Sequence, residues 1–108
     1  MTVEAFVNAI GFKTVCLPSP EKEIDGVYVG DLLSRCMSRV TEGCLWITIM
    51  SNRNIVAVAT LADTACVILA EDVQPDEGVA ELAQQKGINL LLSPDSAYHI
   101  ALRLRDCL

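Results

Sequence analysis

The stretch LWITIMSNRNIVAVATLADTACVILAED, residues 45–72, decides the fold of this chain. Its first and last apolar runs are short and contain β-branched residues, as strands buried on both faces of a sheet do. Periodicity alone does not assign the segment between them. Its length favours a helix over Asn54 to Thr64, and Asn52 and Asn54 are good N-cap residues for that helix. Strand, helix and strand in close succession predict two parallel strands joined by a right-handed crossover.

The same alternation of strands and helices extends to both sides of this stretch. Further strands are predicted at 12–17, 24–29 and 88–92. Helices are predicted after the N-cap candidates Thr2 and Asp31, after Val73 to Glu77 with its helix-starting proline, and after Ser93-Pro94-Asp95. Gly11, Gly43 and Gly87 follow three of these helices as terminators.

This alternation predicts an α/β fold. We expect a single three-layer domain over residues 1–108, with a mainly parallel sheet and helices packed on it. The one clear loop is Pro18 to Asp25.

Composition narrows the classes of function. The net charge is −6 and the eight Lys and Arg residues are scattered, so a nucleic-acid partner is not expected. No apolar run approaches the roughly 20 residues that a spanning helix needs, and no basic region precedes Glu4, so we expect a cytoplasmic protein without a membrane partner. Hydrophobic types make up 52% of the residues, more than soluble chains usually carry. We therefore expect a homodimer that covers part of this aliphatic surface.

The five cysteines form neither a disulfide framework nor a zinc motif. Their number is odd and no CxxC pair occurs; the positions are Cys16, Cys36, Cys44, Cys66 and Cys107. We interpret them as small buried hydrophobic residues in a reducing compartment. A redox-sensitive thiol at Cys36 or Cys44 is the alternative.

A candidate binding site follows from the geometry of a parallel sheet, because ligands bind beyond the carboxyl ends of its strands. The loops at those ends contribute the candidate residues Gly30, Asp31, Asn52, Arg53, Asn54, Glu71, Asp72 and Ser93. Arg53 is the only cation among them, and at a helix start it suits a phosphate or carboxylate. The neighbouring acids oppose an anion, unless Glu71 and Asp72 hold a Mg²⁺ ion.

Other constellations have weaker support. Arg35 and Arg39 lie one helical turn apart, either as an anion clamp or as a solvated face. His99 follows Asp95 by four residues, which allows an acid–base pair or a surface ion pair. The chain has no GxxxxGK[ST], GxGxxG, GxSxG or HExxH motif, so we expect neither catalysis nor a cofactor.

Three segments resemble the DRTGG domain family in order and spacing: GVYVGDLL at 26–33, LWITIM at 45–50, and VAVATLADTACVILAEDVQPDEGVAELAQQKGINLLLSPDSAYHIALRL at 56–104. Relatives in that family include the domain that precedes the kinase domain of HPr kinase/phosphorylase. Arg53 falls where the family has Asp-Arg, with Asn52 in place of the acid, and Ala70-Glu71-Asp72 replaces Thr-Gly-Gly.

The resemblance implies a regulatory or ligand-sensing α/β module without kinase activity. Our leading hypothesis is therefore a non-catalytic module that self-associates and holds a small anionic ligand, such as a nucleotide, at the candidate site. The alternative is an interaction subunit that regulates a partner enzyme or kinase and binds no small molecule.

Overall fold

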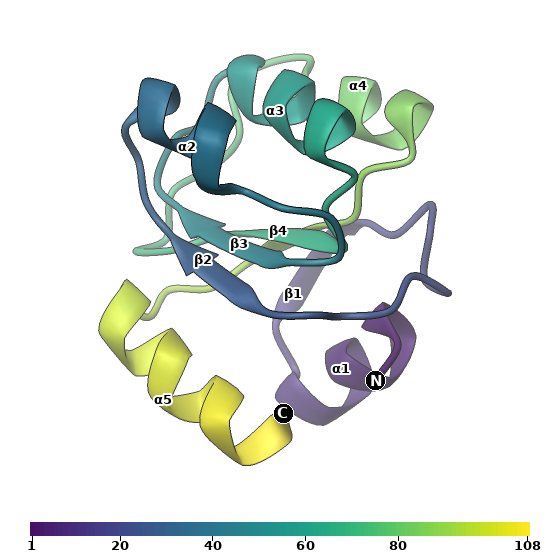
Figure 1. The fold of residues 1–108 in the computed structure, drawn as a ribbon, viewed down its shortest axis with the longest axis vertical. Coiled ribbons are helices and arrows are strands. Elements are labelled where there is room, and N and C mark those ends of the chain that lie inside the picture. The colour runs from purple at the N-terminus through teal and green to yellow at the C-terminus, as the bar shows by residue number, and fades with distance from the viewer.

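The computed structural model describes residues 1–108 as five strands and five helices around one sheet (Figure 1). In chain order the elements are α1 (Val3–Ile10), β1 (Lys13–Cys16), β2 (Val27–Val29), α2 (Leu33–Arg39), β3 (Leu45–Thr48), α3 (Asn54–Ala62), β4 (Cys66–Leu69), α4 (Val79–Lys86), β5 (Leu90–Leu92) and α5 (Ala97–Cys107). The strand order is β1-β5-β4-β3-β2. Strands β2 to β5 are parallel and β1 is antiparallel to β5, which confirms the predicted mainly parallel sheet.

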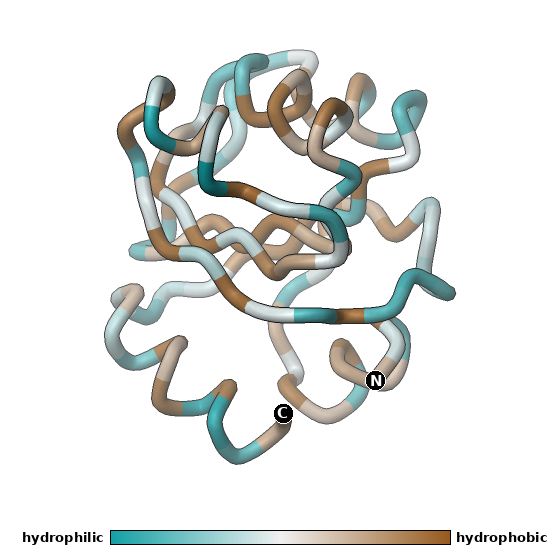
Figure 2. Tube along the Cα trace, viewed as in Figure 1, coloured by the Kyte–Doolittle hydropathy of each residue, from teal (hydrophilic) through white to brown (hydrophobic).

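Helices cover both faces of the sheet and make three layers. Figure 1 shows α2, α3 and α4 on one face and α1 and α5 on the other. The buried side chains divide in the same way, into one cluster around Trp46 and Val67 and another around Phe6 and Ile68. All residues of β3 and β4 are buried, and Figure 2 shows this hydrophobic centre between the two helical layers. Alternate residues of each central strand thus supply the two cores.

The helix predicted in the deciding stretch is present as α3. It begins at Asn54 and ends at Ala62, where Asp63 takes the left-handed conformation with φ 58°. Asn52 acts near its start, because the Asn52 Oδ1 atom accepts a hydrogen bond of 2.9 Å from the Asn54 backbone N–H. Arg53 is the N-cap residue and Asn54 is the first helical residue, so the prediction of Asn54 as a cap is wrong.

The terminators predicted for two other helices are confirmed. Thr2 caps α1 through its hydroxyl oxygen, which accepts a hydrogen bond from the Ala5 N–H at 3.2 Å. Gly11 ends α1 and Gly87 ends α4, and both have the positive φ that glycine adopts without steric cost.

Three helix starts differ from their predictions. Helix α2 begins after Leu32, and the Asp31 carboxylate bonds to the end of β3. Helix α4 begins after the left-handed Gly78 rather than at Pro75. Helix α5 begins after Ser96, whose hydroxyl oxygen accepts a hydrogen bond from the His99 N–H.

Two further elements, α2 and β2, are shorter than predicted. Helix α2 ends at Arg39 with Val40 in an extended conformation, so Gly43 does not terminate it. Strand β2 has three residues rather than six, because Gly26 turns the chain with φ 108° before it. No helix of the structure has the length and apolar character required to span a membrane.

Candidate functional site

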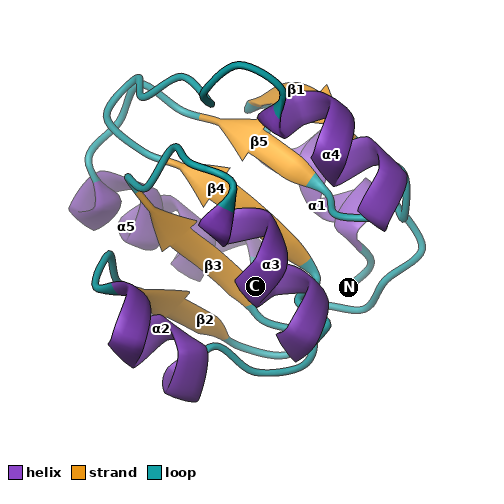
Figure 3. Cartoon of the chain, turned by 90° about the horizontal axis from the view of Figure 1, so that it is seen from above, coloured by secondary structure: helices purple, strands orange, loops and turns teal.

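The loops at the carboxyl ends of the parallel strands meet along one edge of the sheet, which we call the rim: residues 30–32, 49–53, 70–78 and 93–96 (Figure 3). Backbone hydrogen bonds join these loops. Glu71 N–H donates to the Asp95 carbonyl at 2.8 Å, and Asp72 N–H donates to the Ser93 carbonyl at 3.0 Å. Asp76 N–H donates to the Ser51 carbonyl at 2.9 Å. The structure therefore brings the predicted candidate residues to one edge.

Most of the polar groups at the rim bind one another. The Asp31 carboxylate accepts hydrogen bonds from Thr48 Oγ1 at 2.9 Å and from the Ile49 N–H at 2.8 Å. Ser93 is buried, and its hydroxyl oxygen accepts a hydrogen bond from the Asp95 N–H at 3.1 Å. These bonds fix the loops to one another. Asp31 and Ser93 therefore already have partners within the chain.

Gly30 has a packing role. A Cβ atom at this position would lie 2.7 Å from the ring of Tyr28. The Gly30 carbonyl accepts a hydrogen bond of 3.0 Å from the indole N–H of Trp46. The close approach of the Tyr28 ring therefore explains why residue 30 is a glycine, and no bound ligand is needed to explain it.

Glu71 and Asp72, which the resemblance described above sets at the Gly-Gly pair of the DRTGG pattern, have a backbone that suits glycine. Their φ angles are 59° and 61°, and Asp63 is the only other residue besides glycine with a positive φ. Non-glycine residues adopt this conformation at a cost of about 1–2 kcal/mol each. No group of three or more His, Cys, Asp or Glu side chains is arranged to hold a metal ion. Glu71 and Asp72 are therefore not part of such a group.

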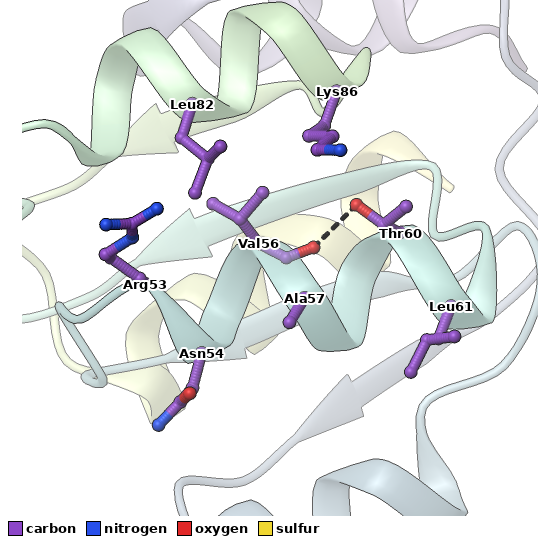
Figure 4. Close-up of a pocket in the computed structure, with 8 residues that line it drawn as sticks. All are labelled: Arg53, Asn54, Val56, Ala57, Thr60, Leu61, Leu82 and Lys86. Atoms are coloured by element: carbon purple, nitrogen blue, oxygen red, sulfur yellow. Dashed lines mark hydrogen bonds between the residues drawn. The ribbon is translucent and has the colours of Figure 1, made fainter.

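Arg53 extends from the rim toward α4, where it shares a hollow with Glu77 and Gly78. Figure 4 shows its side chain directed toward α4, beside Leu82. Its guanidinium takes part in none of the salt bridges or side-chain hydrogen bonds within the chain. Together with Asn54, it lines a groove between α3 and α4 with a volume of about 450 Å³.

The groove has an apolar floor and a cation near each end. Its lining residues are Arg53, Asn54, Val56, Ala57, Thr60 and Leu61 from α3 and its start, and Leu82 and Lys86 from α4. In Figure 4 Val56 lies between the region of Arg53 and the region of Lys86. The Thr60 hydroxyl donates to the Val56 carbonyl at 2.7 Å and is therefore satisfied within the helix. Lys86 has no salt-bridge partner in the chain.

A smaller hollow of about 210 Å³ adjoins the groove at Arg53. Glu77, Glu81 and Gln85 line it. Neither glutamate is within salt-bridge distance of Arg53. These acids add negative potential on the α4 side of the arginine.

The sequence-based site included Arg53 and Asn54 but missed the rest of this groove. The missed residues lie on the outer face of α3 and on α4, whereas the predicted candidates lie in the loops at the strand ends. A signal was present in the sequence, since no charged residue occurs between Arg53 and Asp63. A helix without charges is usually buried all round. Here α3 lies in an outer layer and its Leu61 side chain is 83% exposed, which marks the face as unusual.

The other constellations predicted from the sequence do not form sites. Asp95 precedes α5 rather than lying on it, and its carboxylate pairs with Arg103 at 3.6 Å. His99 instead places its Nδ1 atom 3.0 Å from the Ser96 hydroxyl. The expected Asp95 and His99 pair is therefore wrong. Arg35 and Arg39 line none of the hollows on the surface, as expected of a solvated helix face.

Four of the five cysteines are buried, and Cys107 is partly buried. Burial raises the pKa of the Cys16, Cys36, Cys44 and Cys66 thiols above the usual value. A raised pKa lowers the population of the reactive thiolate. This opposes a redox role for Cys36 or Cys44 and agrees with the interpretation of the cysteines as core residues.

The chain resembles one solved regulatory region. That structure contains the CBS and DRTGG domains of the regulatory region of the Clostridium perfringens pyrophosphatase, complexed with its activator diadenosine tetraphosphate. The TM-score is 0.71 at 14% sequence identity, over 95% of this chain. The match spans 45% of the solved chain of this regulatory region, which is less than half of its length. At this identity the likeness shows a shared fold.

The sequence itself gives the family. No protein with a curated description matches the chain. Residues 7–107 match the DRTGG domain, which extends the resemblance described above from Gly26 back to α1. The match covers nearly the whole chain, and the fold agrees with it. The chain therefore belongs to the DRTGG domain family.

Proposed function

We propose that this DRTGG domain is a regulatory, ligand-sensing module that binds a small anionic molecule in the groove between α3 and α4. One observation carries the proposal: Arg53 and Lys86, two cations without salt-bridge partners, line the same apolar groove of a chain with net charge −6. Of the eight Lys and Arg side chains only Lys22 and Arg103 have a salt-bridge partner, so Arg53 and Lys86 are set apart because they line one groove, not because they are unpaired. Unpaired cations around an apolar floor suit a ligand that carries both a phosphate or carboxylate and an apolar part.

The lining residues offer two kinds of contact, charged and apolar. The Arg53 guanidinium offers planar, bidentate hydrogen bonding to a phosphate or carboxylate, and the Lys86 ammonium offers a compact charge that adjusts on its flexible stem. Val56, Ala57 and Leu82 supply an apolar surface for a base, ring or alkyl chain. At about 450 Å³ the groove matches the size of a small-molecule site.

The structural relative supports the class of ligand. Its region of CBS and DRTGG domains binds a nucleotide activator, diadenosine tetraphosphate, and regulates a pyrophosphatase. By analogy, a nucleotide is the first class of ligand to test for this chain. The proposed role is regulatory and needs no catalytic residue.

Binding to a panel of nucleotides and phosphorylated metabolites tests the proposal. Thermal shift identifies ligands, and calorimetric titration then gives the affinity for the wild type and for Arg53→Ala and Lys86→Ala. We expect each variant to bind about tenfold or more weakly, because a hydrogen bond to a charged group contributes about 1.5–3 kcal/mol.

Arg39→Ala is the matched control. Arg39 is an exposed arginine on α2 that lines no hollow, so its loss changes the net charge as Arg53→Ala does and leaves the groove intact. An equal loss of affinity in Arg39→Ala would show that Arg53→Ala weakens binding only through the change in net charge. Absence of any hit at millimolar concentration would reject the ligand.

A second candidate function is docking onto a partner enzyme, and an exposed apolar face favours it. Met37 on α2 is 62% exposed and lies with Leu61 around a hollow of about 130 Å³ between α2 and α3. Exposed apolar patches of this kind often mark protein interaction sites. Under this alternative Met37→Lys abolishes capture of the partner, whereas Arg53→Ala does not.

A further inference from the structure

The two edges of the sheet differ in how they are protected. At one edge, β1 begins with the charged Lys13, has an irregular register between Thr14 and Cys16, and is followed by Pro18 and Pro20. Charged residues, bulges and prolines are the usual means of preventing an edge strand from pairing with another chain. The other edge, β2, has the sequence Val27-Tyr28-Val29 and none of these features. Its protection consists of its shortness and of the acids Asp25 and Asp31 that flank it.

The backbone of β2 leaves a defined set of groups unpaired. The Leu45 N–H donates to the Gly26 carbonyl at 2.9 Å, and the Gly30 N–H donates to the Ile47 carbonyl at 3.1 Å. Residues of a parallel strand bond alternately to its two sides, so the even-numbered residues face β3. The N–H and C=O groups of Val27 and Val29 therefore face outward, and no hydrogen bond outside the ladder uses them.

These outward groups are also surrounded by apolar surface. The Val27 and Val29 side chains are 43% and 49% exposed. Val27 lines a hollow of about 270 Å³ together with Ala101, Leu104, Arg105 and Leu108 of the α5 region. A strand added at this edge thus gains both backbone hydrogen bonds and apolar contact.

We propose that β2 pairs with β2 of a second copy of this chain, antiparallel and around a two-fold axis at Tyr28, to form one continuous ten-stranded sheet. In this register Val27 lies opposite Val29 of the second copy, and Val29 lies opposite Val27. Both are hydrogen-bonded pairs of an antiparallel ladder, each exchanging two bonds. The outward groups of Val27 and Val29 are then all satisfied.

The neighbouring register toward the start of β2 leaves groups without partners. A shift that centres the axis on Val27 places Asp25 opposite Val29, but the Asp25 N–H already donates to the Gly43 carbonyl within its own chain. The segment Asp25 to Asp31 reads DGVYVGD in both directions, so the register at Tyr28 pairs valine with valine and glycine with glycine. It also brings Asp25 near Asp31 of the second copy, a like-charge contact that opposes pairing. The hydrogen bonds from Thr48 and Ile49 hold the Asp31 carboxylate toward β3.

The side chains favour the same partner. Residues opposite one another in a sheet point to the same face, so Val29 of the second copy comes to lie beside Val27 at the mouth of the hollow near Leu108. On the other face the two Tyr28 rings become neighbours across a non-hydrogen-bonded pair. A second copy thus fits this edge through its backbone and through both faces.

Sedimentation velocity of the full chain over a concentration series tests the proposal. We expect a concentration-dependent dimer, and we expect Val29→Lys to weaken the association at least tenfold, because a lysine on an edge strand opposes pairing. Leu61→Lys is the control, since it places the same charge at an exposed apolar residue on α3. A wild type that stays monomeric, or a dimer that Leu61→Lys disrupts as much as Val29→Lys does, would overturn the proposal.

Amide hydrogen exchange of the wild-type chain provides a test that needs no variant. The Val27 and Val29 N–H groups have no partner within one chain, so they should exchange fast in dilute solution and slowly at concentrations where the dimer forms. Fast exchange at both concentrations, in a sample that sediments as a dimer, would show that another surface makes the contact.

Discussion

Asp72 donates its backbone N–H to the carbonyl oxygen of Ser93 over 3.0 Å while its own backbone holds a left-handed φ of 61°. The loop after β4 is thus fixed to the loop after β5 in a conformation that favours glycine. Glu71 shares this conformation and bonds to Asp95. The chain keeps the backbone that the Gly-Gly pair of its family suits, although it carries two acids there.

Replacing these acids with glycine should stabilise the protein. Glu71→Gly and Asp72→Gly each remove a steric cost of about 1–2 kcal/mol from the folded chain. Each also gives the unfolded chain more conformational freedom, which lowers the free energy of unfolding by about 0.4–1 kcal/mol. We expect each to raise the free energy of unfolding by about 0.5 kcal/mol, measured by urea denaturation. Glu81→Gly, within α4, is the control and should destabilise by about 1 kcal/mol. Destabilisation by all three variants would contradict the assigned loop conformation.

Asn89 is the main polar anchor of the long loop that follows β1. Its Oδ1 atom accepts from the Ser19 N–H at 2.9 Å, and its Nδ2 atom donates to the carbonyls of Ser19 and Ala65 at 2.7 and 2.8 Å. Asn89→Ala leaves these groups unpaired in a buried position, so we expect a loss of about 2–4 kcal/mol in the free energy of unfolding. Chemical denaturation measures it. Asn8→Ala, at an exposed position in α1, should change stability by less than about 0.5 kcal/mol.

The buried thiols predict how stability depends on pH. Burial raises the pKa of Cys66 most clearly, so the folded chain keeps a proton that the unfolded chain releases above about pH 8.5. Stability should therefore be independent of this group below that pH and fall as the pH rises above it, by up to about 1.4 kcal/mol per unit for each fully buried thiol. Urea denaturation at pH 8 to 10 checks this. Cys66→Ala should show a shallower decline, and an unchanged slope would assign the effect to other groups.

The same burial predicts the order in which the cysteines react. Cys107 is the only cysteine that is not fully buried. With a thiol reagent under native conditions, we expect one cysteine to react quickly and four to react only as the chain opens. Mass spectrometry locates the first modified residue. Early modification of Cys36 would contradict the packing of α2 against the sheet.

The sequence predicted the layers of the fold because its central strands are short and almost entirely apolar, and because helices of ordinary length separate them. Leu45 to Met50 and Cys66 to Ala70 leave no solvent-facing side, and a sheet buried on both faces follows. Helix starts were predicted less well. Asp31 and Asp76 have the chemistry of caps, but they bind Thr48 and Ser51 across the rim, and such tertiary contacts leave no local signal in the chain.

The candidate site was also predicted only in part from the sequence. Arg53 was predicted because it is the only cation in the loops at the carboxyl ends of the parallel strands. Lys86 lies at the far end of another helix and reaches the groove only through the packing of α3 against α4. The lack of charge on α3 was the accessible clue. It became informative once the structure showed that helix in an outer layer.

Nuclear magnetic resonance titration of the ¹⁵N-labelled chain with diadenosine tetraphosphate tests the groove most directly, since the ligand is known to bind the structural relative's region. The amides expected to shift are those of Arg53 to Leu61 and of Leu82 to Lys86, with the rim residues Asp31 and Ser93 unaffected. Shifts confined to the rim, or no saturable shifts with this nucleotide or with any hit from the panel, would contradict the proposed site.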